Sequence, residues 1–218
     1  MLSSRQVSST PGSSPFPLQN FTTSGRQAER GSATAYARKK EGGFPDGVTP
    51  ELAAFIAEQD TAFLGTVSAS GAPYIQHRGG PKGFIKVIDE KTLGSADYRG
   101  NRQYITLGNL SENDRAFLFL LDFSRRQRIK LWGRAHVVED DDALIEKLFD
   151  PGYKARPERV ILFTIDAWNA NCSQHITARL SEPEIEQLFA TVQQQIAALQ
   201  AENARLKAAL ASREGAVS

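Results

Sequence analysis

Short strand-like runs joined by hairpin turns occupy the middle of the chain and limit its fold more than any other feature. AFLGTVSASGAPYIQHR predicts two strands joined at Ser70-Gly71, and FIKVIDEKTLGSAD predicts two more joined near Asp89. RAFLFLLDF, RIKLWGRAHVVE and RVILFTIDAW are equally strand-like, whereas the helices predicted after Thr49-Pro50-Glu51 and over DDALIEKLF are brief. Antiparallel strands with brief helices favour a mainly β fold, a β-barrel, over a doubly wound sheet.

Composition and charge exclude several classes of partner. The 218 residues, 40% of them apolar and 23% charged, suffice for one core with appendages. A net charge of +1 gives no global attraction to nucleic acid or to an anionic membrane, and no apolar run approaches the roughly 18 residues of a membrane span. The single cysteine, Cys172, excludes an intrachain disulfide and fits a reducing compartment. We therefore expect a cytoplasmic protein with no nucleic-acid or membrane partner.

The two ends of the chain differ in character from the middle. Residues 1–46 are rich in Ser, Gly and Pro, which predicts a flexible N-terminal arm, and residues 47–180 carry the predicted barrel. Residues 181–213 predict one long helix. Its seam residues follow one another at alternating spacings of four and three: Ile185, Phe189, Val192, Ile196, Leu199, Asn203, Leu206 and Leu210. This spacing is typical of a coiled coil.

Asn203 and its neighbours bear on what that helix packs against. In the heptad that puts Leu199 and Leu206 at d positions, Asn203 falls at a, where a buried amide selects a parallel pair in register. Glu202 at g then faces Lys207 at e of the partner helix. The alternative is an amphipathic helix packed on its own barrel, and the sequence leaves both open.

Two polar loops follow predicted strands. In GSADYRGNRQYITLGNL, the GNRQ segment at 100–103 lies between a strand and a short helix, where backbone N–H groups, amides and a guanidinium suit a phosphate monoester. In QHRGGPKGF, Arg78 follows a strand, and Gly79-Gly80 removes side chains where a flat ligand can approach the backbone. Each loop taken alone also reads as a plain turn, and their combination is what indicates a site.

Linked motifs give the sequence its resemblance to a known family: QHRGG, GNRQY, GNL and NCSQH, with WGRA between the last two. Over roughly Phe44 to Arg179 the chain resembles the pyridoxamine 5′-phosphate oxidase-like family of flavin-binding split-barrel proteins, and within it the branch of predicted flavin-nucleotide-binding proteins. The resemblance implies an FMN-binding split barrel of six strands that forms a homodimer, with FMN in the cleft between subunits. It does not extend to the coiled-coil helix.

Carried over residue by residue, the resemblance implies a cofactor site drawn from several segments. The residues are Arg78 and Gly79 near the flavin and its ribityl chain, Lys86 as a basic contact, Asn101, Arg102 and Gln103 at the phosphate, and Cys172, Gln174 and His175 from the neighbouring subunit. Strand alternation leaves open whether Lys86 points to the cofactor or to solvent. Asp97 is expected to hold Arg78 or Arg102 in place, because buried charges are normally paired.

Other sites that the polar residues suggest lack supporting features in the sequence. Cys172 and His175 come without a recognisable oxyanion hole or orienting third group for a thiol nucleophile. His77, His136 and His175 come without coordinating acids, so no metal site is predicted. The basic run RRQRIK reads as a solvated hairpin. A leucine-zipper DNA binder would need a basic helix continuous with the coil, and TARLSEPE precedes the coil instead.

These observations predict an FMN-dependent oxidoreductase that acts on a small molecule. They identify no catalytic residue, substrate or electron donor. One alternative is a non-catalytic flavin-binding carrier or redox sensor with the coiled coil as its output, and another is an assembly scaffold in which the coil is the working part.

Overall fold

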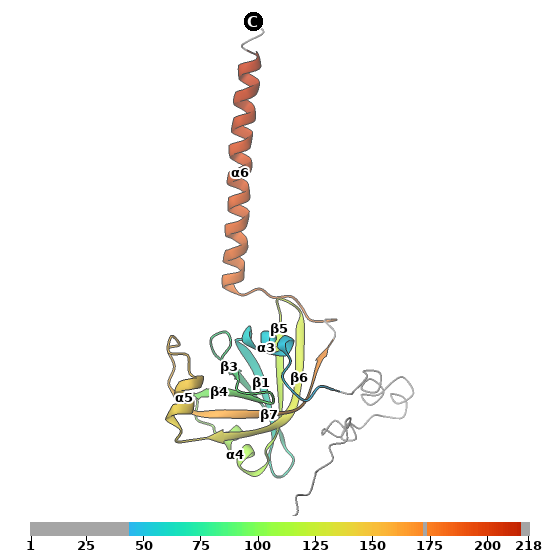
Figure 1. The fold of residues 1–218 in the computed structure, drawn as a ribbon, viewed down its shortest axis with the longest axis vertical. Coiled ribbons are helices and arrows are strands. Elements are labelled where there is room, and N and C mark those ends of the chain that lie inside the picture. Colours follow the sequence, from blue (N-terminus) through green and yellow to red (C-terminus); the bar gives the residue numbers. More distant parts are fainter. Residues whose placement is uncertain (1–43, 172–173, 215–218) are drawn as a thin grey trace, which may run out of the picture. The chain divides into compact units, whose positions relative to one another are not determined.

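The computed structural model describes residues 44–171 and 174–214, and its main body is a curled antiparallel sheet (Figure 1). Within these residues seven strands lie in the order β2-β1-β5-β6-β7-β4-β3, and every neighbouring pair is antiparallel. The strands are β1 (Thr61–Val67), β2 (Pro73–Gly79), β3 (Ile85–Val87), β4 (Thr92–Tyr98), β5 (Arg115–Asp122), β6 (Gln127–Val138) and β7 (Pro157–Asn171). The expected mainly β fold is confirmed. The resemblance implied six strands, whereas the described residues form seven.

Three short helices lie beside the sheet, and the signals that begin two of them are local. They are α3 (Pro50–Ala57), α4 (Ile105–Glu112) and α5 (Asp142–Leu148), and the long α6 (Glu182–Glu214) follows the barrel in sequence. The Thr49 hydroxyl accepts from the Leu52 N–H at 3.3 Å to cap α3, and Asp141 accepts from the Leu144 N–H at 2.9 Å to cap α5. In the described part of the chain, none of the helices combines the length and apolarity that a membrane span needs.

The core lies inside the curled sheet, where alternate residues of each strand point inward. Burial alternates residue by residue along β1 and through most of β5 and β6, so one face of each strand is apolar and enclosed. Contributions come from the strands and from α3, and the most deeply buried side chains include Leu52, Ile56, Leu93, Leu120, Leu131 and Ile165.

The sheet curls until its two ends are linked by side chains. β2 forms one end, and β4 lies next to the other end. Arg78 on β2 donates to the Asp97 carboxylate on β4 at 2.5 Å, and the two side chains are only 13% and 11% exposed. The Thr106 hydroxyl of α4 donates to Gln76 of β2 at 2.7 Å. These contacts place the end of β2, the end of β4 and the start of α4 together.

The chain divides into two compact units. The first contains the barrel and includes residues up to 122 together with 127–174, and the second combines the turn at 123–126 with the chain from His175 onward. Within the second unit, the Arg179 guanidinium lies 4.9 Å from the centre of the Phe123 ring.

Gly133 provides a test of how tightly β6 and β7 pack. The register between these strands shifts at Trp132 and Gly133, and a Cβ on Gly133 would overlap the carbonyl oxygen of Thr164 on β7. We expect Gly133→Ala to lower the free energy of unfolding by about 1–3 kcal/mol, because the strands must separate to admit the methyl group. Urea denaturation followed by tryptophan fluorescence measures this.

Gly108→Ala is the matched control. Gly108 lies in α4, and a Cβ there would meet nothing within 4 Å among the described residues. Alanine should therefore leave the free energy of unfolding unchanged or raise it by up to about 1 kcal/mol, as expected in an open helix position. Equal stability of the Gly133→Ala variant and the parent would show that the two strands do not pack as described.

Candidate functional site

A pocket lies between the end of β2, the end of β4 and the loop that leads into α4. Four residues predicted from the sequence line it: Arg78, Asn101, Arg102 and Gln103. Its volume is about 50 Å³, well below the roughly 300–1,000 Å³ of pockets that enclose a whole small-molecule ligand. In the single chain the pocket therefore has room for only one end of a nucleotide.

The loop between β4 and α4 has an unusual backbone. Arg102 and Tyr104 have φ angles of 61° and 56°, in the left-handed region that side chains other than glycine occupy at a cost of about 1–2 kcal/mol. Asn101 accepts a hydrogen bond from the Gln103 N–H at 3.3 Å, which helps to fix the turn. Backbone strain of this kind persists only where surrounding structure enforces it, and it is often found at ligand sites.

The start of α4 offers backbone donors to this pocket. Tyr104 precedes the helix, and among the described residues it provides no side-chain capping hydrogen bond. The N–H groups of a first helical turn have no partner within the helix, and together with the helix dipole they favour an anion.

Two polar residues of the same stretch are structural. Thr106 and Asn109 are buried, with exposed fractions of 1% and 9%. Thr106 donates to Gln76, and the Asn109 amide donates to the Thr66 hydroxyl on β1 at 3.0 Å. These bonds hold α4 against β1 and β2 and thereby fix the position of the loop that precedes it.

A network of charges surrounds Asp97. The expectation that Asp97 holds an arginine is confirmed for Arg78, whereas Arg102 is exposed. The second oxygen of Asp97 lies 3.9 Å from Nε of Arg159, whose guanidinium also lies 3.2 Å from Glu158 and 3.4 Å from Glu139. The two carboxylates that line the pocket, Asp97 and Glu158, are thus engaged by arginines of the barrel.

Arg159 is a charged neighbour of the site that the sequence did not reveal, and it contacts lining residues without being among the described residues that line the pocket itself. It lies opposite Asp97 in the register of β4 and β7, and its guanidinium lies 5.3 Å from the centre of the Tyr104 ring. Its side chain is 11% exposed, and its Nε has no hydrogen-bond partner among the described residues. The cross-strand register was the signal needed to pair Arg159 with Asp97, and the sequence does not specify it.

Tyr98 adds no negative charge to the pocket wall. Burial raises the pKa of the Tyr98 phenol, and the nearby Tyr153 and Asp150 raise it further, against a smaller opposite effect of Arg78. The phenol therefore remains neutral around pH 7 and does not repel an anion in the pocket.

The other predicted site residues are not brought into this pocket. Gly79 follows Arg78 on β2, and the half-buried Lys86 lies on the edge strand β3, but neither is among the described residues that line the pocket. Gln174 and His175 are exposed; Gln174 ends the last segment of the first unit, and His175 belongs to the second unit. Cys172 lies outside the described residues.

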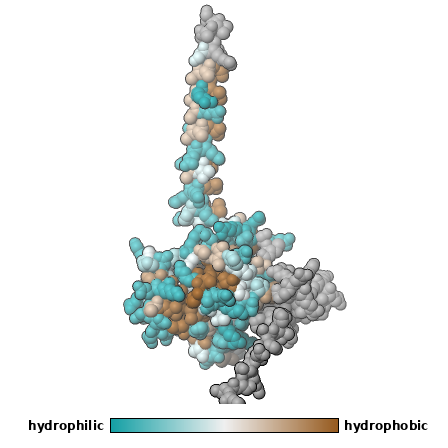
Figure 2. Space-filling view, in the orientation of Figure 1, coloured by the Kyte–Doolittle hydropathy of each residue, from teal (hydrophilic) through white to brown (hydrophobic). Residues whose placement is uncertain are grey.

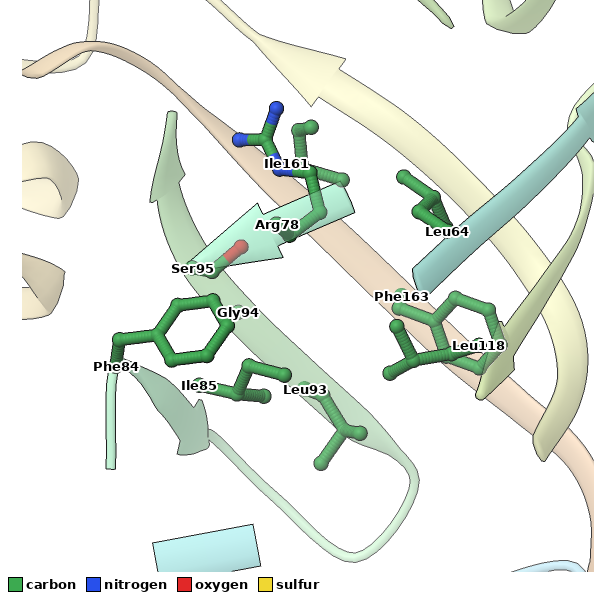
Figure 3. A pocket seen from close by; sticks show the side chains of 10 residues that line it. All are labelled: Leu64, Arg78, Phe84, Ile85, Leu93, Gly94, Ser95, Leu118, Ile161 and Phe163. Carbon is green, nitrogen blue, oxygen red and sulfur yellow. The ribbon is translucent and has the colours of Figure 1, made fainter. Parts of the chain in front are cut away.

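A second cavity lies inside the barrel, and Arg78 lines this cavity as well. Figure 3 shows Arg78 and Ser95 bringing polar groups to a lining that is otherwise apolar, with Phe84, Leu118 and Phe163 among its members. Its volume of about 30 Å³ is close to that of one water molecule. This cavity is too small for a flavin ring. Over residues 44–171 and 174–214, no cluster of three or more His, Cys, Asp or Glu could hold a metal ion.

Comparison with known proteins identifies the family. A family model described as pyridoxamine 5′-phosphate oxidase matches residues 48–172, which is more than half of the chain. The chain belongs to this family. No match was found among curated proteins.

Three of the solved structures similar to this family member are each less than 20% identical to it over the aligned part. HupZ of Group A Streptococcus is 18% identical over 62% of this chain and 99% of its own, with a TM-score of 0.47. An FMN-binding protein from Syntrophomonas wolfei is 17% identical over 55% and 83%, with a TM-score of 0.44. A Clostridium acetobutylicum protein related to general stress protein 26 of Bacillus subtilis, from the pyridoxinephosphate oxidase family, is 17% identical over 58% and 88%, with a TM-score of 0.43.

The contacts of Asp97 predict that removing its carboxylate strongly destabilises the fold. Asp97→Ala leaves the largely buried guanidiniums of Arg78 and Arg159 without their shared partner, so the free energy of unfolding should fall by about 3 kcal/mol or more. Urea denaturation measures the loss.

Asp114→Ala is the matched control, because it removes another Arg–Asp pair of the barrel. The Arg134–Asp114 pair has side chains 55% and 50% exposed, so solvent screens it and its loss should lower the free energy of unfolding far less than the loss of Asp97 does. Similar losses in the two variants would contradict a special role for Asp97.

Proposed function

We propose that this protein binds FMN with the FMN phosphate in the pocket at the start of α4. The observation that carries the proposal is the convergence of Arg78, Asn101, Arg102 and Gln103 on one small pocket beside a helix start that Tyr104 leaves uncapped within the described residues. A phosphate monoester offers negative charge and several acceptor oxygens, and guanidinium, amide and backbone N–H donors complement both. Membership of the family adds support, because FMN binding is what the family resemblance implies.

The charges of the described residues fit a phosphate. Asp97 is engaged by Arg78, and Glu158 lies within 3.9 Å of both Arg99 and Arg159. Both carboxylates line the pocket, and each is paired with an arginine, which offsets its negative charge. Arg102 is exposed on the wall of the pocket, where its fork of N–H donors is accessible to phosphate oxygens.

We further propose that the protein is a homodimer and that the flavin ring is bound with the help of a second subunit. The pocket of the single chain matches only the phosphate end of FMN. A row of partly exposed aromatic rings on β1, β5 and β6 supports an interface, with Phe63, Phe117, Phe119 and Trp132 in successive ring contacts of 5.6–6.4 Å. Aromatic side chains dominate the energetics of protein interfaces.

The proposed reaction class is oxidation and reduction of a small organic molecule. When bound, FMN supplies an acceptor and donor of hydride or single electrons. The chain's own part in the proposal is to bind and orient the phosphate through residues 100–103, while Asp97 keeps the Arg78 guanidinium in one position. Substrate contacts and catalytic residues are not part of the proposal.

A non-catalytic carrier or redox sensor is the second candidate, and the exposed apolar face of α6 favours it because such a face can transmit a signal to a partner. The two candidates differ in turnover. Reduction of the bound flavin without oxygen, followed by addition of air or a panel of electron acceptors, distinguishes them. Repeated reoxidation at catalytic rates supports the oxidoreductase, and a single slow reoxidation supports the carrier or sensor.

Arg102→Ala tests the phosphate assignment. Loss of a charge-assisted hydrogen bond worth roughly 1.5–3 kcal/mol should weaken FMN binding at least tenfold. Riboflavin lacks the phosphate, so its affinity should stay the same. Titration of each flavin into the apoprotein, followed by quenching of flavin fluorescence, measures both affinities.

Arg115→Ala provides the matched control, because Arg115 is an exposed arginine on β5 that is not among the described residues lining the pocket. It should bind both flavins as the parent does. If Arg102→Ala binds FMN and riboflavin with the parent's affinities, the phosphate does not lie in this pocket.

A further inference from the structure

An apolar stripe, interrupted by Asn203, runs along α6 and is exposed in the single chain. The helix spans 33 residues, which at about 1.5 Å per residue is roughly 50 Å. Figure 2 shows apolar side chains at the surface along its length. The apolar seam positions are between 38% and 66% exposed: Ile185, Phe189, Val192, Ile196, Leu199, Leu206 and Leu210. A helix with such an uncovered face gains stability by burying it against another element.

We propose that this face pairs with α6 of a second copy of the chain, as a parallel, in-register, two-stranded coiled coil. The inference goes beyond flavin binding and does not depend on it. The heptad phase puts Ile196 at an a position and Leu199 and Leu206 at d positions. In this central heptad, a β-branched residue at a with leucine at d is the combination that favours two parallel strands. The outer layers carry Phe189 and Leu210 at a and Ile185 and Val192 at d, so the choice of a parallel pair rests on Asn203.

Asn203 decides between parallel and antiparallel pairing. In a parallel, in-register pair each a residue meets the same a residue of the partner, so the two Asn203 amides donate to and accept from each other. In an antiparallel pair, a positions face d positions, where this helix carries Ile185, Val192, Leu199 and Leu206. Each buried amide would then lose its hydrogen-bond partner, at a cost that disfavours this arrangement.

Charge complementarity supports the same arrangement. Glu202 at g and Lys207 at e are five residues apart, which is the spacing that brings a g residue beside an e residue of a parallel partner. The preceding g and e positions, Gln195 and Gln200, are neutral amides, so this register brings no like charges together there. A second copy therefore matches the face in both its apolar and its charged positions.

Cysteine cross-linking in the full chain tests the pairing and its direction. Leu206→Cys places a thiol at a d position, where the two copies face each other, so mild oxidation should convert most of the protein into a disulfide-linked dimer. Ala208→Cys, two residues later at an f position on the opposite side of the helix, is the matched control and should cross-link at least tenfold more slowly. The native Cys172 is present in both variants and in the parent, and peptide mass spectrometry identifies the 206–206 link.

Equal cross-linking of the two variants, or none in either, would overturn the proposal. If no 206–206 link forms, α6 instead packs on its own barrel, in an antiparallel pair or on an unrelated protein.

Charge exchange provides a second test, in which all the chains compared share the same apolar seam. In the parallel register, Glu202→Lys and Lys207→Glu each create like-charge pairs, so each variant alone should dimerise through α6 several-fold more weakly than the parent. An equimolar mixture restores opposite charges at both positions and should recover the parent's rate of 206–206 cross-linking when every chain also carries Leu206→Cys, measured at low salt. A mixture that cross-links no faster than either variant alone would contradict the parallel register.

Discussion

The ion pair between Arg78 and Asp97 is the interaction on which the candidate site depends. It links β2, at one end of the curled sheet, with β4, beside the other end, and both side chains are largely removed from solvent. A buried pair of this kind is stable only while both partners are present, because either charge alone would be strongly destabilising. The guanidinium of Arg159 on β7 approaches the same carboxylate, so a second largely buried charge also depends on Asp97. The same ion pair therefore links the two ends of the sheet and fixes the position of Arg78, which lines the pocket.

The position of α4 determines where the loop that lines the pocket lies. Thr106 and Asn109 fix the helix to β2 and β1 by buried hydrogen bonds, and the loop before it then follows a strained path through Arg102 and Tyr104. Arg102 and Tyr104 line the pocket along this path. Polar residues that are neighbours in this short stretch therefore have two roles. Thr106 and Asn109 hold the helix in place, and Asn101, Arg102 and Gln103 line the proposed phosphate site.

The sequence predicted what depends on local patterns and missed what depends on register. Strand alternation, hairpin turns and the Thr49 cap are set by residues a few positions apart, and the structure contains all of them. The clustering of Arg78 with residues 101–103 followed from linked motifs. The pairing of Arg159 with Asp97 joins residues far apart in sequence, so it required the alignment of β4 with β7. Lys86, Gln174 and His175 came from resemblance alone, and their roles at the cofactor remain predictions.

The most direct test of the central claim is the visible spectrum of the purified protein, combined with mass spectrometry of what it releases on denaturation. The account predicts flavin absorption bands and a released molecule with the mass of FMN, either as purified or after incubation with FMN and removal of the excess. A protein that remains colourless after that incubation, or that retains riboflavin as readily as FMN, would contradict the proposed phosphate pocket.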